Sequence, residues 1–189
     1  MKKLVTCKEM KDLDSTTIRE IGVPSEVLME RAALKVVEET EKYLQKDERI
    51  LVVCGSGNNG GDGIAVARLF HLKGIRVEFY MVGNKDKMTR ETALQYKIAS
   101  GYRVPEVNNP QWSEYTTIVD AVFGVGLTRP IEGHYADIIH EMNSARAKKI
   151  AVDIPSGVNG DTGLEMGIAF SADLTVTFAY RKRGLCFYP

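Results

Sequence analysis

The hydrophobic residues of this chain gather in short continuous runs, and the stretches between the runs carry apolar residues at helical spacing. The runs lie at residues 50–54, 75–82, 117–122, 150–154 and 174–178. A run of this length is typical of a strand buried on both faces of a parallel sheet. Helical patterns lie between them, around 62–73, 88–100 and 131–145. The alternation predicts an α/β fold, a three-layer αβα sandwich on a mostly parallel sheet, as a single domain over residues 1–189.

Two further helices are predicted before the first strand. Thr6 and Glu9 have the spacing of a capping box, which predicts a helix through about residue 20. Pro24 and Ser25 open a second helix, whose apolar residues recur at helical spacing and predict a stripe that faces the core. The stripe comprises Val27, Leu28, Ala32, Ala33, Val36 and Val37.

Composition narrows the class of partner. Lys and Arg together number 25, as do Asp and Glu, and this balance gives no electrostatic reason to expect nucleic acid or an anionic membrane as a partner. No apolar stretch approaches the ~20 residues of a membrane helix, and the N-terminus lacks the apolar segment of a signal peptide. Cys7, Cys54 and Cys186 are far apart and odd in number, which favours a reducing compartment and a cytoplasmic location. We expect the basic triplet at 181–183 to be solvated surface.

Polar residues follow three of the predicted strands. The first strand runs into the glycine-rich segment 55–63, the third ends at Asp120, and the fourth ends at Asp153. Ligands of open parallel sheets bind beyond the carboxyl ends of the strands. We therefore expect a site at this edge, since a purely structural turn needs glycine but no aspartate.

The glycine-rich segment is formally a dinucleotide fingerprint. Gly55, Gly57 and Gly60 have the required spacing between a strand and a helix, where backbone N–H groups and the helix dipole favour a phosphate. No Lys-Ser/Thr pair follows, so ATP hydrolysis gains little support.

Side-chain oxygens also gather at this edge, on Asn58, Asn59, Asp62, Asp120 and Ser156. Oxygen ligands without sulfur or imidazole suit a hard cation. The alternative is that these residues form turns and cap a helix, and for Asp62 alone the two interpretations are equally good.

Three motifs follow one another along the chain: Asn-Asn-Gly-Gly-Asp-Gly at 58–63, Asp-Ala-Val-Phe-Gly at 120–124 and Asp-Ile-Pro-Ser-Gly at 153–157. Together with Met10-x-x-Leu13-Asp14 and the segment 24–30, this ordered set resembles the signature of the NAD(P)HX epimerases, the YjeF N-terminal domain family. The resemblance extends over nearly the whole chain. It implies a Rossmann-like fold, and an isomerase that interconverts the R and S epimers of hydrated NADH or NADPH in metabolite repair.

The resemblance also implies which residues act. Asp153 matches a substrate-contacting acid and is our candidate for the catalytic group. Asn59, Asp120 and Ser156 match side chains that hold one potassium ion (K+) per subunit. Two segments match the family's substrate-binding loops, namely Asn58, Asn59, Gly60, Gly61 and Asp62 in the first, and Gly124, Val125, Gly126, Leu127, Thr128, Arg129 and Pro130 in the second.

Partners are implied by the same resemblance. In many bacteria the domain is fused to a dehydratase, so we expect functional coupling to an NAD(P)HX dehydratase, fused or separate, and a homodimer is left open. Two departures from the family matter. Arg31 stands where the family usually has asparagine, and the chain stops at Pro189, where the family normally continues with a further strand. We therefore expect a domain that is short at its C-terminus.

A mechanism follows from the substrate, which carries a hydroxyl on a carbon next to a ring nitrogen. Protonation of the hydroxyl lets water leave and forms an iminium-like cation, and water can return to the other face. A carboxyl group such as that of Asp153 can serve as acid and then as base.

Two alternatives to this function stay open. The first is a non-catalytic nucleotide-ligand-binding or protein-interaction scaffold of the same fold, against which the intact acids and the glycine-rich loop count. The second is a nucleotide-dependent kinase or oxidoreductase. A kinase of the P-loop type would need a phosphate-binding lysine that is missing here, and hydride transfer would change the NAD(P)H absorbance.

Overall fold

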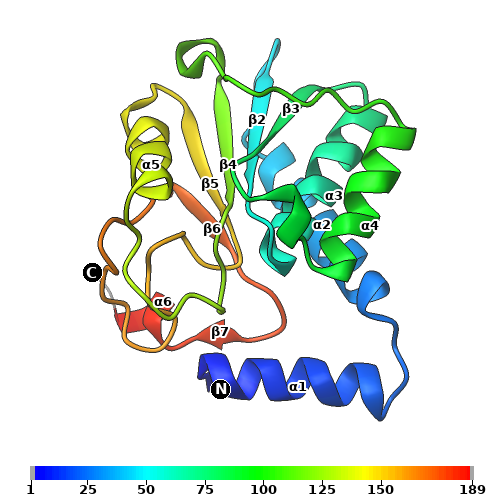
Figure 1. Cartoon of the computed structure of the whole chain (residues 1–189), viewed down its shortest axis with the longest axis vertical. Helices are drawn as coiled ribbons and strands as arrows, with labels where there is room; N and C mark the ends of the chain where they lie inside the picture. The colour runs from blue at the N-terminus through cyan, green and yellow to red at the C-terminus, as the bar shows by residue number, and fades with distance from the viewer. Residues whose placement is uncertain (1–2, 188–189) are drawn as a thin grey trace.

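The computed structural model describes residues 3–187, and a five-stranded parallel sheet lies at its centre (Figure 1). The strands are β2 (Arg49–Cys54), β3 (Arg76–Met81), β4 (Thr117–Ala121), β5 (Lys148–Val152) and β6 (Leu174–Val176). Each overlaps one of the hydrophobic runs, so the five predicted strands are confirmed. Their order is β3-β2-β4-β5-β6, because the chain goes from β2 to β3 on one side and then crosses back to β4 on the other. The order therefore reverses at β2, where doubly wound sheets bind their ligands.

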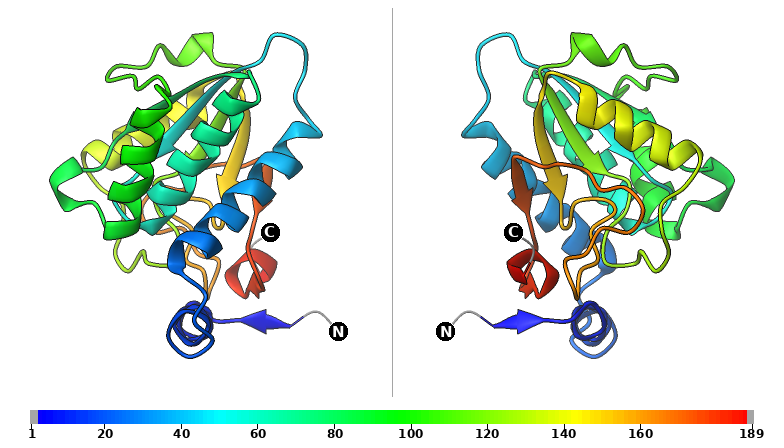
Figure 2. Two further views of the ribbon diagram at one scale, coloured as in Figure 1. Left: turned by 90° about the vertical axis from the view of Figure 1, so that its right-hand side faces the viewer. Right: turned by 90° about the vertical axis from the view of Figure 1, so that its left-hand side faces the viewer.

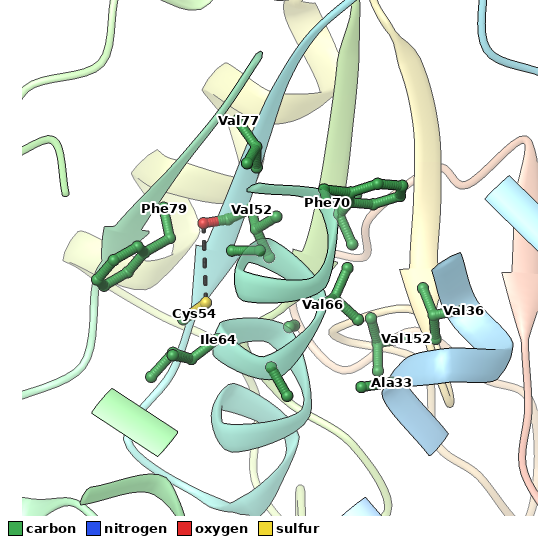
Figure 3. Close-up of a cluster of buried hydrophobic side chains, with 14 of the residues drawn as sticks. Ala33, Val36, Val52, Cys54, Ile64, Val66, Phe70, Val77, Phe79 and Val152 are labelled. Atoms are coloured by element: carbon green, nitrogen blue, oxygen red, sulfur yellow. Dashed lines mark hydrogen bonds between the residues drawn. The ribbon is translucent and has the colours of Figure 1, made fainter. Parts of the chain in front are cut away.

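Helices cover both faces of the sheet, which confirms the three-layer αβα prediction. One face is covered by α2 (Ser25–Glu41), α3 (Asn58–Leu72) and α4 (Arg90–Gly101), and the other by α5 (His134–Ser144) (Figures 1 and 2). On the first face, Val36, Val66 and Phe70 belong to one buried cluster with Val52 and Val152 of the sheet (Figure 3). Helix α3 lies between α2 and α4 and is apolar nearly all round, as burial on three sides requires.

Helix α3 approaches the sheet closely because Gly63 faces it. A Cβ atom at Gly63 would collide with the side chain of Ala121 and would lie 3.0 Å from Sγ of Cys54. Cys54 is fully buried, and burial raises the pKa of its thiol. This cysteine therefore acts as a small core residue.

The predicted stripe of α2 is confirmed at its centre but is wrong at Val27. Ala33 and Val36 are fully buried, whereas Val27 is 45% exposed. Val27 shares a helix face with Arg31 and Leu34, which are also exposed, and that face points away from the sheet.

The N-terminal segment lies beside the three layers (Figure 2). It contains β1 (Leu4–Val5) and α1 (Cys7–Arg19), and the predicted capping box is confirmed. The Thr6 hydroxyl accepts from the N–H of Glu9 (3.1 Å), and the N–H of Thr6 donates to the Glu9 carboxylate (2.7 Å). Strand β1 pairs in parallel with β7 (Arg181–Lys182), which leads into α6 (Gly184–Phe187). Segments from opposite ends of the chain thus form one small sheet.

Two short 3-10 helices, Lys85–Lys87 and Trp112–Glu114, complete the elements. Within residues 3–187, no helix is both long enough and apolar enough to cross a membrane.

Candidate functional site

Close backbone contacts build the loop between β2 and α3. The N–H of Gly55 donates to the carbonyl of Ala121 (3.0 Å), which joins the loop to β4. A Cβ atom at Gly60 would collide with the Gly55 carbonyl, and one at Gly61 would lie 2.8 Å from Cε of Met29. These glycines therefore let the first turn of α3 sit against the strand end and α2. Within that turn, the N–H groups of Gly60 and Gly61 donate to the carbonyl of Gly57 (2.9 and 3.3 Å).

Asp120 and Ser156 meet behind this loop. Asp120 is fully buried, and its Oδ1 accepts from the Ser156 hydroxyl (2.6 Å) and from the N–H of Val122 (3.1 Å). Its Oδ2 accepts from the N–H of Ser156 (2.7 Å). Burial raises the pKa of Asp120 to about 6, although the hydrogen bonds from Ser156 and Val122 act in the opposite direction.

Asn59 approaches the same pair from α3. Its Nδ2 is buried without a hydrogen-bond partner, and a Cβ atom at Gly124 would lie 3.2 Å from its Oδ1. Gly124 follows Phe123, whose N–H donates to the Ser156 hydroxyl (2.8 Å). The structure thus joins Asp120 and Ser156 directly, and places Asn59 one loop away from them.

Asp153 directly follows β5 in a strained turn. Its φ is 68°, and the turn is closed by the N–H of Ile154 donating to the carbonyl of Val152 (2.9 Å). A three-residue turn with a positive φ at its centre is rare and strained, and such strain gathers at functional sites. The turn carries the Asp153 side chain to the carboxyl edge of the sheet, where we predicted it.

The Asp153 carboxylate forms an ion pair with Lys182, which is only 1% exposed. The expectation of a solvated triplet at 181–183 is therefore wrong for its middle residue. Arg181 and Arg183 are exposed, but the pairing of β7 with β1 turns Lys182 inward. Neither composition nor spacing predicted this lysine as part of the site.

A cavity of about 1220 Å³ lies between this edge, α1 and α2. Eight of the predicted site residues line it: Asn58, Asn59, Asp62, Gly124, Val125, Gly126, Leu127 and Asp153. The other predicted substrate-binding residues do not line it, because Gly60 and Gly61 are buried in the packing of α3, while Thr128, Arg129 and Pro130 are exposed beyond it. Asp14, Arg31, Thr177 and Lys182 also line the cavity and were not predicted to act.

Two acids in the cavity are held toward their neutral forms. Burial raises the pKa of Asp62 well above its ordinary value, and the negative charges of Asp153 and Asp14 raise it further. Burial likewise raises the pKa of Asp14. The positive charge of Lys182 acts in the opposite direction on both. Asp14, Asp62 and Asp153 thus interact with one buried ammonium, that of Lys182, in the same cavity, an arrangement typical of acid–base chemistry.

Comparison with known proteins identifies the family. The model of the YjeF-related protein N-terminus matches residues 25–184. The chain belongs to this family. It is 46% identical to an NAD(P)H-hydrate epimerase of Limosilactobacillus fermentum over 182 residues, which cover 96% of this chain and 88% of the relative. It is 49% identical to an NAD(P)H-hydrate epimerase of Oenococcus oeni over 185 residues, which cover 96% and 87%.

The fold is also that of a solved structure. The crystal structure of the yeast protein ynu0 superposes with a TM-score of 0.87 at 23% identity, over 99% of this chain and 84% of the yeast chain. At this identity the likeness supports the fold alone. It confirms the Rossmann-like expectation.

Proposed function

We propose that this member of the YjeF family interconverts the R and S epimers of hydrated NADH and NADPH in the cavity beyond the sheet. The activity is that of an isomerase, the epimerase for which its bacterial relatives are named. The observation that carries the assignment to this cavity is Asp153, a strained acid that lines it at the carboxyl end of β5.

The cavity has the size and lining for the substrate. Its volume exceeds the ~300–1,000 Å³ of ordinary small-molecule pockets, so it can take a dinucleotide. Asn58 and Asn59 bring the N-terminus of α3 to its wall, where backbone N–H groups and the helix dipole favour a phosphate. The pyrophosphate would therefore lie at α3.

Asp153 is the proposed acid–base group. Protonation of the substrate hydroxyl lets water leave, and the lone pair of the ring nitrogen stabilises the resulting cation. Water then adds to the opposite face and gives up a proton. A positioned carboxyl group contributes ~10²–10⁴ to the rate of such proton transfers.

One potassium ion per subunit is proposed at Asn59, Asp120 and Ser156. No group of three or more His, Cys, Asp or Glu side chains within residues 3–187 could hold a metal ion, so the cation would depend on hydroxyl and amide oxygens beside Asp120. Such donors suit a hard monovalent cation. The partnerless amide of Asn59 fits as well, since a half-turn of the amide exchanges its nitrogen for oxygen. The ion would offset the buried charge of Asp120 and order the two loops.

Epimerase activity can be tested with a mixture of both hydrate epimers and a dehydratase that accepts only one of them. Complete consumption of the mixture, faster than spontaneous epimerisation allows, is the expected result. Binding of the hydrates without turnover would instead favour the scaffold of the same fold.

The cellular setting is proposed as well. Cys7, Cys54 and Cys186 are all free thiols, as in proteins of the cytoplasm. A dehydratase that consumes one epimer would be the functional partner, because the epimerase supplies it with the other.

A further inference from the structure

Lys182 is tightly held, although the proposed chemistry has not used it. A buried lysine charge is costly unless it is paired and hydrogen-bonded. An ammonium group has three protons to donate. Lys182 Nζ donates to Oδ1 of Asp153, to Oγ1 of Thr177 (2.9 Å) and to the carbonyl of Phe178 (3.2 Å). Its three donors are matched by three acceptors, which fixes the ammonium in one place.

Two parts of the fold meet at this ammonium group. Thr177 and Phe178 follow β6, the neighbour of β5, which Asp153 directly follows. Lys182 itself reaches in from β7, which is held by β1 outside the main sheet. Its side chain therefore ties Asp153 to the N-terminal segment.

The hydrogen bonds of Asp153 are divided unequally between its two oxygens. Oδ1 accepts from Lys182 and from Thr177 Oγ1 (3.2 Å), with the N–H of Phe178 at 3.5 Å. Oδ2 accepts no hydrogen bond from the part of the chain that the structure describes. Since Asp153 lines the cavity, one oxygen is anchored and the other is available to a ligand.

We propose that Lys182 is the positioning residue of the epimerisation site, where it anchors Oδ1 of Asp153 so that Oδ2 can exchange a proton with the substrate. This inference rests on the proposed function. Oδ2 donates its proton to the substrate hydroxyl, the C–O bond breaks, water leaves with the bonding electrons, and the ring nitrogen forms a C=N bond. When water adds to the opposite face, the C–O bond re-forms, the electrons return to nitrogen, and Oδ2 takes the released proton. Nothing is oxidised or reduced, and Lys182 keeps its protons throughout.

The rival explanation is a buried ion pair that only stabilises the fold. Removing one partner of such a pair leaves an unpaired charge and lowers stability, whereas replacing both partners can be neutral. Activity and melting temperature must therefore be measured on the same preparations of Lys182→Met, of Asp153→Asn and of the double variant. The dehydratase-coupled assay supplies kcat and KM for each.

The expected result is a loss of ~10²-fold in kcat for Lys182→Met, with KM changed by less than about threefold. The kcat of the double variant should be no more than about threefold below that of Asp153→Asn, because both substitutions act on the same carboxylate, that of Asp153. Losses that multiply toward ~10⁴-fold would show that the two residues act independently and would overturn the proposal. So would a folded Lys182→Met protein with near-normal kcat.

Two further variants guard against a trivial loss of fold. Lys149 is a matched control, since its Nζ also donates to carbonyls, those of Ala145 (3.0 Å) and Ala147 (3.4 Å), but it lies outside the cavity. Lys149→Met should keep the activity of the unaltered chain.

In Lys182→Ala, added ethylamine should restore kcat saturably while ethanol does not. Failure of this rescue in folded protein counts against the proposal. An unaltered chain without epimerase activity would instead refute the proposed function itself.

Discussion

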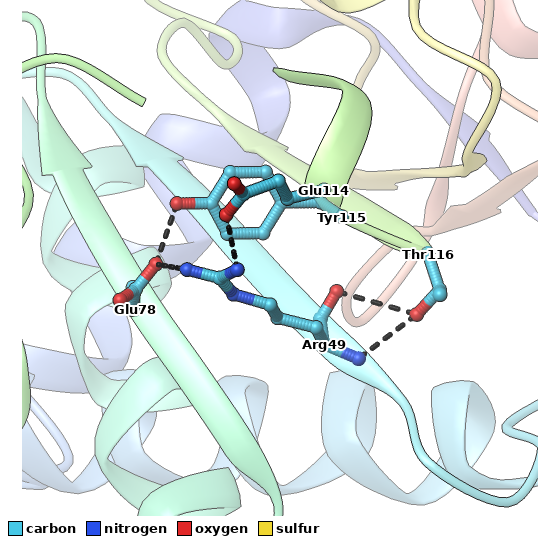
Figure 4. A network of polar contacts seen from close by, with 5 residues as sticks. All are labelled: Arg49, Glu78, Glu114, Tyr115 and Thr116. Carbon is cyan, nitrogen blue, oxygen red and sulfur yellow. Dashed lines mark hydrogen bonds and ion pairs between the residues drawn. The ribbon is translucent and has the colours of Figure 1, made fainter. Parts of the chain in front are cut away.

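The two edges of the central sheet both carry clusters of charged and polar side chains. In only one of the two clusters do the polar groups find their hydrogen-bond and ion-pair partners within the chain. At the amino edge, the guanidinium of Arg49 pairs with Glu114 and Glu78, and the hydroxyl of Tyr115 donates to Glu78 (2.5 Å) (Figure 4). The Thr116 hydroxyl accepts from the backbone N–H of Arg49 (2.9 Å). Each of these groups finds its partner within the chain, as structural polar networks do.

At the carboxyl edge the polar groups are left incomplete. Asp14, Asp62 and Asp153 share one ammonium, that of Lys182, and the buried Nδ2 of Asn59 has no partner. Asp153 also sits in a strained turn. Strain and unsatisfied groups that stability alone would remove are expected where a ligand completes the site. The difference separates a cluster that holds the sheet together from one that fits the proposed substrate and cation.

Asp153→Asn should give the largest effect, at the incomplete edge. Asparagine keeps the size and much of the hydrogen bonding of Asp153 but cannot exchange a proton near neutral pH. We expect epimerisation per folded molecule to fall ~10²-fold or more, and the melting temperature to fall as well, because the substitution leaves the buried Lys182 without its charge partner. A folded variant with near-normal turnover would remove Asp153 from the mechanism. Lost stability with activity falling only in proportion to folded protein would mark it as structural.

The pH dependence of stability should report the buried charge of Asp120. Its pKa is raised by burial from 3.8 to about 6. The folded state therefore binds more protons than the unfolded state in this range, so the contribution is fully present below about pH 4 and is lost as pH rises through about 6. For a fully buried group this shift corresponds to about 3 kcal/mol. In buffer whose only cation is a bulky organic one, unfolding free energy should fall over this window, and Asp120→Asn should flatten the slope. An equal slope in both proteins would contradict the assignment.

Potassium should offset part of the stability that is lost by burying the charge of Asp120. Binding to the folded state alone stabilises by mass action, by about 1.4 kcal/mol at tenfold the dissociation constant. We expect a higher melting temperature in potassium chloride than in the chloride of a bulky organic cation at equal ionic strength. Asp120→Asn should abolish the difference. Identical melting curves for the unaltered chain in the two salts would count against the cation site.

Much of the fold could be predicted because its causes are local. A strand buried on both faces must be apolar throughout, so the stretch that became β4 was visible as a run. The capping box of Thr6 and Glu9 depends on a spacing of three residues, and it was equally visible. The polar residues at strand ends were predicted for a related reason, since the topology of a parallel sheet brings those ends to one edge.

The parts that were missed depend on contacts between distant segments. Lys182 is buried because β7 pairs with β1, more than 170 residues away, and no local pattern encodes that pairing. The one available signal was strand alternation, which would turn the middle of the triplet opposite to Arg181 and Arg183. The place of Asp14 in the cavity depends similarly on how α1 lies across it, which is tertiary information.

The smallest effect is expected from Tyr115→Phe, at the satisfied edge. Tyr115 is 3% exposed, and its hydroxyl donates one hydrogen bond, to Glu78. The substitution therefore removes one hydrogen bond and little volume. Glu78 keeps its ion pair with Arg49 (3.3 Å) and is partly exposed, so the loss should be about 1 kcal/mol. For a domain of this size that lowers the melting temperature by about 2–4 °C. Activity per folded molecule should stay within about twofold, because the site lies at the other end of the strands. Asp153→Asn should by contrast lose most of its activity per folded molecule, and a large activity loss in Tyr115→Phe without a fall in melting temperature would mean that the two edges do not divide structure from function.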